Sequence, residues 1–312
     1  AMTIIEAQRK TAQILREGGV ENAMNEARFL LEDALGMDNV QLVTGYRDHA
    51  CEACVETAFA WAARRAAGEP LQYILGHTDF MGLDMKVAPG VLIPRPETEG
   101  LCGLLKEEAK RRSAEQQAAG ALRQSAEQPA AGTLQTGGQP WSSRILDLCT
   151  GSGCIAAWAG HAFAGASVTA TDLSEEALAV AKENCKAYEA HPGQIVLKQG
   201  DLFDALDDGE TFDVILSNPP YIPSETVDAL EPEVKDHEPR LALDGGPEGM
   251  DIVNRIIAQA PDHLAPGGLL LMEIDDTQEG LVLSACWQSG KWSKYEVLHD
   301  LAGKVRYLKA YK

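Results

Sequence analysis

Strand-like and helical segments alternate from Trp141 to the end of the chain, and this alternation constrains the fold more than any other feature. The strand-like runs are RILDLCTG, ASVTATDLS, QIVLKQGDLF, FDVILSNPP and GGLLLMEI, with YEVLHDL and KVRYLKAY as closing strands. The helical runs are GCIAAWAGHAF, EEALAVAKENCKAYEA and GMDIVNRIIAQAPDHL. Such alternation predicts an α/β fold with a doubly wound, mostly parallel sheet over residues 141–312. Ligands of these sheets bind at the carboxyl ends of the strands.

The chain before this sheet has the pattern of a small helical domain over residues 1–75. Apolar residues recur at helical spacing in IIEAQRKTAQILREGG, ENAMNEARFLLEDALG and CEACVETAFAWAARRAAGEP. The segment HTDFMGLDMKVAPGVLIPRPETE then combines β-prone residues with Gly and Pro. It predicts a β-hairpin and connector over residues 76–112, with a helix from Thr98 to Arg112.

Residues 113–140 have a different composition. SAEQQAAGALRQ is followed directly by the similar SAEQPAAGTLQT, and Ala, Gln, Gly and Ser dominate both units. The segment has too few large apolar groups to bury a core, and two units are too few to stack as a solenoid. We interpret it as a duplicated, low-complexity flexible linker. The Gly-Gly-Gln at 137–139 is interpreted as a chance match. The six residues from Gln139 to Ile145 reach at most about 20 Å, whereas the expected crevice lies at the opposite edge of the sheet and around a packed domain.

Composition and charge exclude several classes of protein. Hydrophobic content of 45% and charged content of 24% are typical of a soluble globular protein, and the apolar runs are too short to span a bilayer. The chain opens without a charged and apolar leader, and its seven scattered cysteines indicate a reducing compartment. A net charge of −20 argues against binding to a phosphate backbone. We therefore expect a cytoplasmic monomer with no membrane or nucleic-acid partner.

One short cluster has the residue types of a metal site. His49, Cys51 and Cys54 lie close together in DHACEAC. No second Cys pair or nearby His completes four ligands, so we expect no metal there.

A glycine-rich turn follows the first strand of the predicted sheet. LDLCTGSGCIA carries Gly151 and Gly153 between a strand and a helix, and Asp172 lies 21 residues beyond Gly151. Small residues at such a turn let a nucleotide approach the backbone, and an acid at the end of the second strand binds ribose hydroxyls. Both NAD and S-adenosylmethionine contain adenosine, so this pattern fits either ligand.

Acidic residues at two further strands are candidate ligand contacts. Asp147, inside the first strand, can meet the positive methionine end of S-adenosylmethionine. Asp201 and Leu202 follow the third strand, where Leu202 can pack against an adenine while Asp201 accepts a hydrogen bond from its amino group.

The fourth strand ends in SNPPYIP, which is an unusual way to make a turn. Prolines fix φ and remove backbone donors, so the corner is stiff. The side-chain oxygen of Asn218 and the carbonyl of Pro219 are two acceptors that suit one planar NH₂ group, with one hydrogen bond to each hydrogen. Pro220 stiffens the corner further, and Tyr221 can lie against the face of that group. This arrangement favours methyl transfer to nitrogen over nicotinamide chemistry.

These motifs together resemble a known family. LDLCTGSG, TDLS, GDLF and SNPPYIP resemble a seven-strand, Rossmann-like class I methyltransferase that uses S-adenosylmethionine and methylates amino or amide nitrogen. PLQYILGHTDFMG, VLIPRPETE and EPRLALDGGPEGM resemble the protein-(glutamine-N5) methyltransferase family, often called PrmC or HemK. That family modifies the Gly-Gly-Gln glutamine of peptide chain release factors, which supports translation termination. The resemblance covers nearly the whole chain except residues 113–140, and it implies S-adenosylhomocysteine as a product.

The resemblance also assigns roles to single residues. It implies catalytic contacts to the substrate amide by Asn218, Pro219, Pro220 and Tyr221. It implies cofactor contacts by Thr150, Gly151, Ser152, Gly153, Asp172, Leu202 and Asn218, beside Asp147 and Asp201 from the reasoning above. Cys149 stands where a Gly is common, and Leu202 stands where an aromatic is common.

Three other functions stay open at this point. A related enzyme could methylate a glutamine of a ribosomal protein, and the amide contacts would be the same. A DNA or RNA amino-methyltransferase would need a basic groove, which the charge of −20 disfavours. A non-catalytic adenosine-binding module would not need Asn218 to Tyr221.

Overall fold

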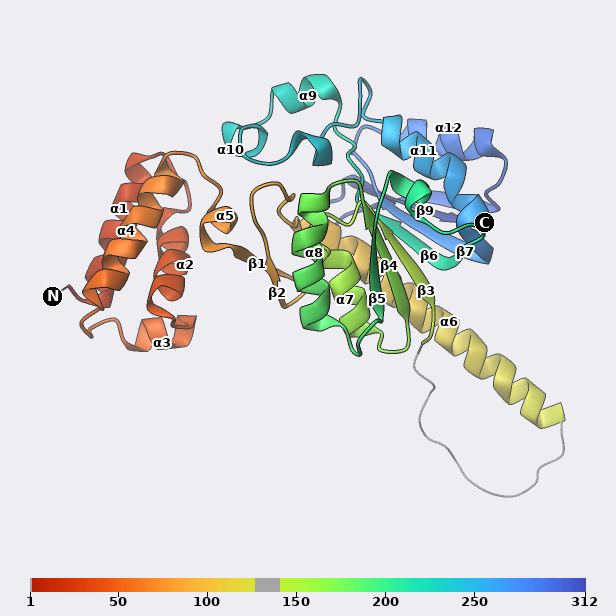
Figure 1. Cartoon of the computed structure of the whole chain (residues 1–312), viewed down its shortest axis with the longest axis horizontal. Coiled ribbons are helices and arrows are strands. Elements are labelled where there is room, and N and C mark those ends of the chain that lie inside the picture. Colours follow the sequence, from red (N-terminus) through yellow and green to blue (C-terminus); the bar gives the residue numbers. More distant parts are fainter. Residues whose placement is uncertain (1, 127–140) are drawn as a thin grey trace. The chain divides into compact units, whose positions relative to one another are not determined.

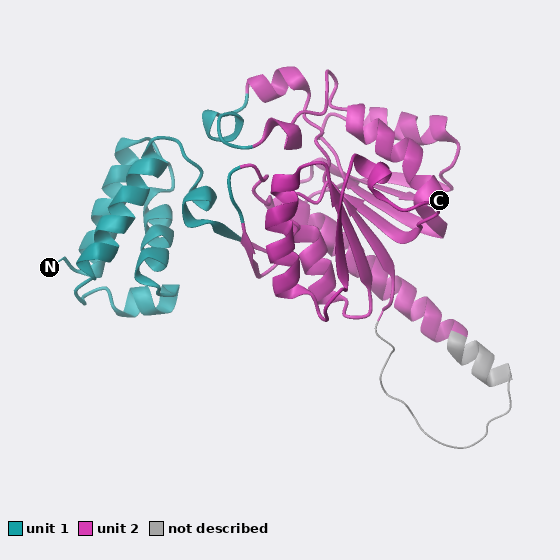
Figure 2. Ribbon diagram, viewed as in Figure 1, with its two compact units in different colours: residues 1–78, 87–89, 230–238 teal, residues 79–86, 90–229, 239–312 magenta. Residues whose placement is uncertain are grey.

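The computed structural model describes residues 2–126 and 141–312. The chain divides into two compact units (Figure 2). Unit 1 comprises residues 1–78, 87–89 and 230–238, and unit 2 comprises residues 79–86, 90–229 and 239–312. The helical domain, the hairpin and the mostly parallel sheet that the sequence predicts are all confirmed.

Unit 1 is a helical bundle. Its helices are α1 (Ile4–Glu17), α2 (Ala23–Leu35), α3 (Asn39–Thr44), α4 (Glu52–Ala66), α5 (Leu71–Leu75) and α10 (Pro232–Lys235). Leu15, Leu30 and Ala62 bring α1, α2 and α4 together in a buried core. Gly18 is required where α1 ends, because a Cβ there would lie 2.5 Å from the Cβ of Ala66. The sequence pattern predicted the three long helices; α3 and α5 are too short to carry a helical repeat.

The hairpin consists of β1 (His77–Phe80) and β2 (Leu83–Lys86). Met81 and Gly82 connect them with φ values of 55° and 77°. Positive φ at both central residues is the backbone that a tight two-residue hairpin loop requires.

Unit 2 is built on a seven-stranded sheet of order β5-β4-β3-β6-β7-β9-β8 (Figure 1). The strands are β3 (Arg144–Leu148), β4 (Ser167–Asp172), β5 (Ile195–Gln199), β6 (Phe212–Ser217), β7 (Leu264–Glu273), β8 (Lys294–His299) and β9 (Val305–Tyr311). The five strands from β5 to β7 run parallel, and β9 runs antiparallel to both β7 and β8. The antiparallel pairing is confined to the closing strands.

Helices and short turns connect these strands. The α-helices of unit 2 are α6 (Glu99–Ala126), α7 (Cys154–Ala162), α8 (Glu175–Tyr188), α9 (Ser224–Asp228), α11 (Asp251–Gln259) and α12 (Glu279–Ser289). The 3₁₀ turns are η1 (Pro96–Thr98), η2 (Leu202–Ala205), η3 (Arg240–Ala242) and η4 (Ala260–His263).

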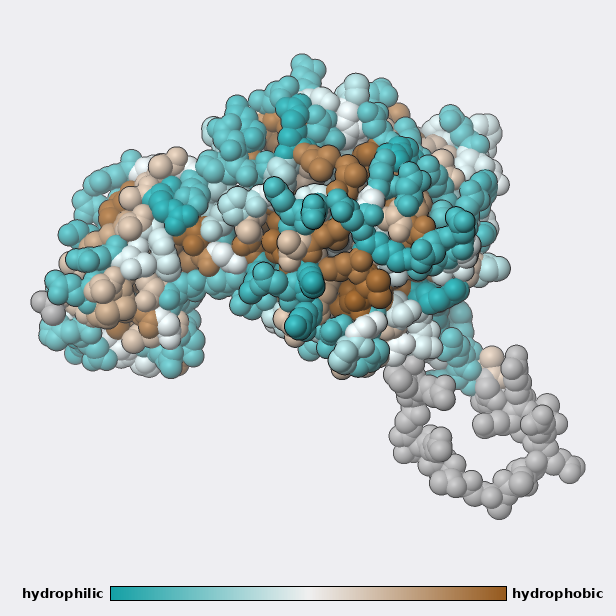
Figure 3. Space-filling model, viewed as in Figure 1, coloured by the Kyte–Doolittle hydropathy of each residue, from teal (hydrophilic) through white to brown (hydrophobic). Residues whose placement is uncertain are grey.

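Neighbouring residues along each central strand face opposite sides of the sheet, and both sides are apolar. Ile145 and Val214 pack in a core with α6, α7 and α8. Leu146 and Ile215 pack in a second core with α11 and α12. This is the pattern of parallel strands covered by helices on both faces. Some apolar side chains of the unit stay exposed, among them Leu173, Val196 and Leu241, and Figure 3 shows hydrophobic surface on the visible face of unit 2.

Helix α6 corrects one boundary that the sequence suggested. The expected helix ended at Arg112 and a flexible linker was expected from residue 113, but α6 continues to Ala126. Ala, Gln, Glu, Leu and Arg are strong helix formers, so the backbone stays helical there although the side chains of residues 114–119 are exposed. The rest of the expected linker, with its Gly-Gly-Gln, lies outside the described residues.

The parallel strands bring the predicted site residues to one edge of the sheet. The chain leaves β3 at the glycine-rich turn, β4 at Asp172, β5 before Asp201 and β6 before Asn218. Carboxyl ends of parallel strands share one edge, so these four points converge. Within residues 2–126 and 141–312, no helix combines the length and apolarity that crossing a bilayer requires.

Candidate active site

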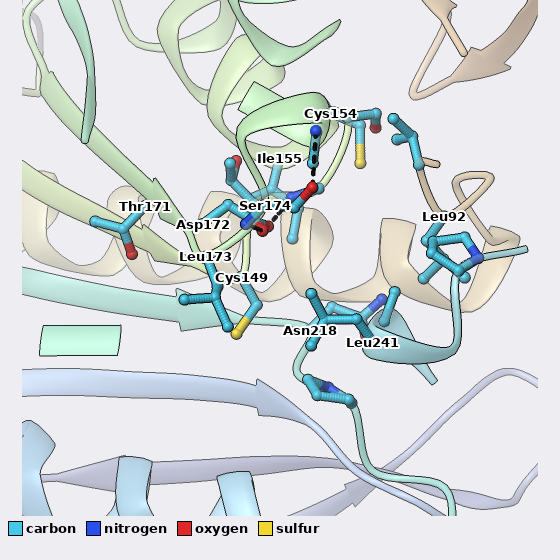
Figure 4. A pocket seen from close by; sticks show the side chains of 18 of the residues that line it. Leu92, Cys149, Cys154, Ile155, Thr171, Asp172, Leu173, Ser174, Asn218 and Leu241 are labelled. Carbon is cyan, nitrogen blue, oxygen red and sulfur yellow. Dashed lines mark hydrogen bonds between the residues drawn. The ribbon is translucent and has the colours of Figure 1, made fainter. Parts of the chain in front are cut away.

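A pocket lies over the carboxyl ends of the strands of unit 2. Figure 4 shows Asp172 and Cys149 on one side of the cavity, with Leu92 and Leu241 on the other. Asn218 lines it from the end of β6. The lining also includes the glycine-rich turn at 149–152, the segment 200–202 after β5, Thr98, Pro220 and Pro239. Most of the sequence-predicted cofactor residues are therefore gathered around one cavity.

The glycine-rich turn leaves room for a ligand on one side and packs tightly on the other. Gly151 has a φ of 56°, and a Cβ built there would meet no atom within 4 Å. Gly153 has a φ of 76°, but a Cβ there would lie 2.9 Å from the Cβ of Ala181 on α8. The first glycine thus opens the pocket, and the second lets α7 approach α8.

Asp172 is oriented by the backbone of two turns. Its Oδ2 accepts a hydrogen bond from the Gly151 amide at 2.8 Å, and its Oδ1 accepts one from the Ser174 amide at 2.9 Å. Burial raises the pKa of this carboxyl, although the backbone donors partly offset that effect. Each carboxylate oxygen can accept a further hydrogen bond, so Asp172 can still bind a pair of hydroxyl groups in the pocket.

Asp147 lies behind the turn and has 0% of its surface exposed. Its Oδ2 accepts a hydrogen bond from the Thr150 hydroxyl at 2.6 Å. Burial raises the pKa of Asp147 to about 7. We had expected Asp147 to meet a ligand directly, but here it has no exposed surface and contacts the pocket wall through Thr150. A strand side chain alternates between the two faces of a sheet, and its distance from the pocket is not visible in the sequence.

The segment after β5 presents one apolar and one charged residue. Leu202 is buried, lines the pocket and has a φ of 52°. Asp201 also lines the pocket, and its two oxygens accept hydrogen bonds from Arg255 of α11 at 3.1 and 2.9 Å. Arg255 therefore fixes the Asp201 carboxylate, which sequence reasoning had treated as an isolated acceptor.

Asn218, itself half-buried, belongs to a chain of hydrogen-bonded polar groups that continues into the interior. Its Nδ2 donates to Thr98 Oγ1 at 3.1 Å, and the Thr98 hydroxyl donates to Glu273 Oε2 at 2.8 Å. The other oxygen of Glu273 accepts from the Tyr221 hydroxyl at 2.7 Å. Thr98 belongs to η1 and Glu273 ends β7, so three segments far apart in the sequence meet here.

The prolines and Tyr221 differ in their positions relative to the pocket. Pro220 lines it, whereas Pro219 is buried. Tyr221 was expected to lie against a substrate amide, but its ring packs against the core on the α11 and α12 side. Burial and the neighbouring Glu273 carboxylate raise the pKa of its phenol. In this structure the hydroxyl of Tyr221 donates to Glu273, and this hydrogen bond holds the ring behind the pocket wall.

Several pocket residues were not singled out from the sequence. Thr98, Leu92 and Leu241 line the pocket, and Glu273 lies behind it. Thr98 and Glu273 are 175 positions apart, so no local motif links them. A buried acid at the end of the apolar strand LLLME is the one local signal that could have marked Glu273.

The geometry fits an adenosine ligand better than a metal ion. The open space over Gly151, the oriented Asp172 carboxylate and the apolar Leu202 provide a backbone approach, hydroxyl acceptors and a surface for a flat ring. Among the residues that the structure describes, no group of three or more His, Cys, Asp or Glu side chains could hold a metal ion.

Known proteins are similar in sequence to this chain over nearly its full length. The chain is 39% identical to a release factor glutamine methyltransferase of Geobacter sulfurreducens over 280 residues, which cover 90% of this chain and 87% of that protein. The chain belongs to the release factor glutamine methyltransferase family. A second such methyltransferase, from Koribacter versatilis, is 36% identical over 98% of this chain and 97% of its own length.

Two family models match separate parts of this methyltransferase. The PrmC N-terminal domain matches residues 6–76, and the methyltransferase small domain matches residues 131–236. Among solved structures, the 16S rRNA N2 G1207 methyltransferase RsmC of T. thermophilus has a TM-score of 0.48 and 17% identity, covering 76% of this chain and 49% of that one. Because the family consists of methyltransferases, the chain belongs neither to a family of NAD-dependent enzymes nor to one of non-catalytic adenosine-binding modules.

Proposed function

We propose that this chain transfers a methyl group from S-adenosylmethionine to the side-chain amide nitrogen, N5, of the glutamine in the Gly-Gly-Gln motif of peptide chain release factors. The observation that carries the proposal is the Asn218 carboxamide at the end of β6, held on its nitrogen side by Thr98 in a chain of this family. A held carboxamide with a free oxygen suits an NH₂ group of a substrate.

The cofactor would be held by the turn and by the ends of β4 and β5. Gly151 gives backbone access while Gly153 lets α7 pack against α8, Asp172 accepts from ribose hydroxyls and Leu202 packs against adenine. Thr150 and Ser152 shape the turn, with Asp147 behind it and Asp201 beside it. When bound, S-adenosylmethionine supplies an electrophilic methyl group on a positively charged sulfur.

The chemistry asked of this chain is orientation of a weak nucleophile. An amide nitrogen is poorly nucleophilic because its lone pair is delocalised into the carbonyl. Asn218 Oδ1 and the Pro219 carbonyl, each accepting one N–H, increase the electron density on that nitrogen and favour its pyramidal form. Fixed acceptors in a buried site act most strongly as the transition state develops. The surplus proton leaves after transfer, because an N-methylated tetrahedral amide is strongly acidic.

The partner and the setting of the enzyme follow from the same proposal. The substrate is a protein, the release factor, and the enzyme acts as a cytoplasmic monomer. Its net charge of −20 disfavours direct binding of nucleic acid.

The test combines a substrate control with one variant. Labelled S-adenosylmethionine and a purified release factor should give label on the Gly-Gly-Gln glutamine, and a release factor lacking that glutamine should stay unlabelled. Asn218→Ala should lower turnover by roughly 10²- to 10⁴-fold, since orientation and transition-state hydrogen bonding are lost together. Calorimetry should still detect cofactor binding, because Gly151 and Asp172 are unchanged.

Two results would overturn the proposal in different ways. Turnover of Asn218→Ala within a few-fold of the wild type would remove the amide-binding role of Asn218. Label on a ribosomal protein glutamine, with none on the release factor, would replace the substrate and keep the chemistry.

A further inference from the structure

We infer that Glu273 and Thr98 are positioning residues that determine which way the Asn218 carboxamide faces. The inference rests on the proposed function, because it concerns the atom of Asn218 that is offered to the substrate amide. Neither residue belongs to the glycine-rich turn or to the Asn-Pro-Pro-Tyr segment.

The geometry is a relay of three side chains. Glu273 is 1% exposed and Thr98 is 2% exposed, so their hydrogen bonds face no competition from bulk water. The Thr98 hydroxyl donates to Glu273 Oε2 at 2.8 Å, and Asn218 Nδ2 donates to the same hydroxyl oxygen at 3.1 Å.

The direction of each bond follows from counting protons. Both oxygens of Glu273 accept from hydroxyl groups in this structure, Oε2 from Thr98 and Oε1 from Tyr221. The single proton of Thr98 is then used on Glu273, and the hydroxyl has only lone pairs left for Asn218. Asn218 must therefore turn its NH₂ toward Thr98, and its Oδ1 becomes the end available to the pocket.

The opposite orientation would oppose the proposed chemistry. If the carboxamide flipped, its NH₂ would face the NH₂ of the substrate glutamine, and two donors would meet without an acceptor. A buried donor without an acceptor is strongly disfavoured. Through Thr98, the Glu273 carboxylate thus favours the orientation of Asn218 that can accept a hydrogen bond from the substrate NH₂.

The hydrogen bonds around Glu273 hold it as an acceptor. Tyr221 donates its hydroxyl to Oε1 at 2.7 Å, and Thr98 donates its hydroxyl to Oε2 at 2.8 Å. Burial raises the pKa of Glu273 and the Glu97 carboxylate adds to that rise, whereas the two hydroxyls and the charge of Arg306 oppose it. Arg306 is itself fixed by Asp300 at 3.2 Å.

Thr98→Val tests the relay because it keeps the shape of the side chain and removes the hydroxyl. We expect kcat on the release factor to fall roughly tenfold, the scale of one lost hydrogen bond. The cofactor Kd should stay within twofold, and Thr98→Ser should restore turnover to within threefold of the wild type. Thr11→Val is the matched control, because Thr11 is a fully buried threonine in α1 whose hydroxyl donates to the Ala7 carbonyl of its own helix.

A double-mutant cycle separates positioning from general damage. If Thr98 acts through Asn218, Thr98→Val should have almost no further effect in the Asn218→Ala background. Effects that multiply in the double variant would overturn the inference. Glu273→Gln is the second variant, for use if Thr98→Val does not fold: one acceptor oxygen becomes a donor, and turnover should again fall roughly tenfold. Turnover within twofold of the wild type would contradict the relay.

A spectroscopic readout keeps the inference separate from the proposed function. The side-chain NH₂ signal of Asn218, assigned by its absence in Asn218→Ala, should exchange slowly with solvent in the wild type and fast in Thr98→Val. Unchanged exchange would overturn the relay even if the release factor is methylated. Slow exchange lost in Thr98→Val, in a chain that never labels a release factor, would keep the relay and sink the proposed function.

Discussion

At the scale of single residues, the pocket depends on acids whose burial changes their protonation. Asp147 has a pKa raised to about 7 from its usual 3.8, since burial removes the water that would solvate its charge. The Thr150 hydroxyl lowers the pKa but does not cancel the effect. The folded chain therefore holds a proton on Asp147 at pH values where the unfolded chain does not.

Asp147→Asn should separate from the wild type as the pH rises. A folded-state pKa above the unfolded value stabilises the fold at low pH, and this stabilisation is lost as the pH passes through the folded-state pKa. The unfolding free energy of the wild type should fall relative to that of Asp147→Asn between about pH 4 and pH 7. The difference should then stay constant above about pH 7. Urea unfolding at several pH values measures this, and parallel curves across that range would show that Asp147 is ionised in the fold.

Cys149 and Leu202 carry backbone strain at the pocket. Their φ values are 59° and 52°, a region that costs a side chain about 1–2 kcal/mol. The resemblance to the family places a common Gly at position 149, and the positive φ explains that preference physically. The strained residues flank the pocket, where a fixed backbone serves ligand binding better than a relaxed one.

At the scale of elements, η1 and the first turn of α6 lie close to β9 at Tyr307. The Tyr307 hydroxyl of β9 donates to the Glu97 carbonyl of η1. A Cβ on Gly100, in the first turn of α6, would overlap that hydroxyl. Glycine is therefore needed at position 100 so that β9 can hold the turn that carries Thr98.

Gly100→Ala should displace this turn. Overlap in a packed site costs roughly 1–3 kcal/mol of stability, and turnover should fall with it because Thr98 moves. Gly103→Ala is the matched control, since a Cβ there meets no atom within 4 Å and a helix gains up to about 1 kcal/mol from Ala. Thermal unfolding and steady-state turnover of the pair decide the matter. Equal behaviour of the two variants would mean that the approach of β9 to η1 relaxes freely.

The elements also show what could be predicted from the sequence and why. The central strands were predicted because both faces of each strand are apolar. Asp172 and Asn218 were predicted as site residues because they stand at the ends of β4 and β6. Helix α12 was missed, and its exposed Trp287 blurs the separation of apolar and polar faces. The Glu273 to Asn218 relay was missed because its members meet only after the sheet forms. Tertiary contacts of that kind leave no periodic trace.

At the scale of the whole molecule, the net charge of −20 gives the enzyme a preference for basic partners. A release factor places its glutamine loop against ribosomal RNA, so we expect positive surface around that loop. Acidic and basic surfaces attract before contact, which raises the association rate.

Association of the enzyme with a release factor should therefore slow as salt is added. Stopped-flow rates from about 20 mM to 500 mM salt should fall by at least tenfold, because ions screen the long-range attraction. Dissociation rates should change much less over the same range. Association rates that do not change with salt would show that the enzyme recognises the release factor by direct contacts, without long-range electrostatic attraction.

The position of β9 also orders events during synthesis of the chain. β9 is made after β7 and β8 yet lies between them, so β8 has no partner in the sheet until β9 has left the ribosome. Tyr307 arrives with the same strand and completes the attachment of η1. A nascent chain can thus form its glycine-rich turn early, whereas the residues that orient Asn218 are secured only after β9 has inserted between β7 and β8. An enzyme proposed to prepare the factors that end translation would itself stay inactive until β9 has been made and has joined the sheet.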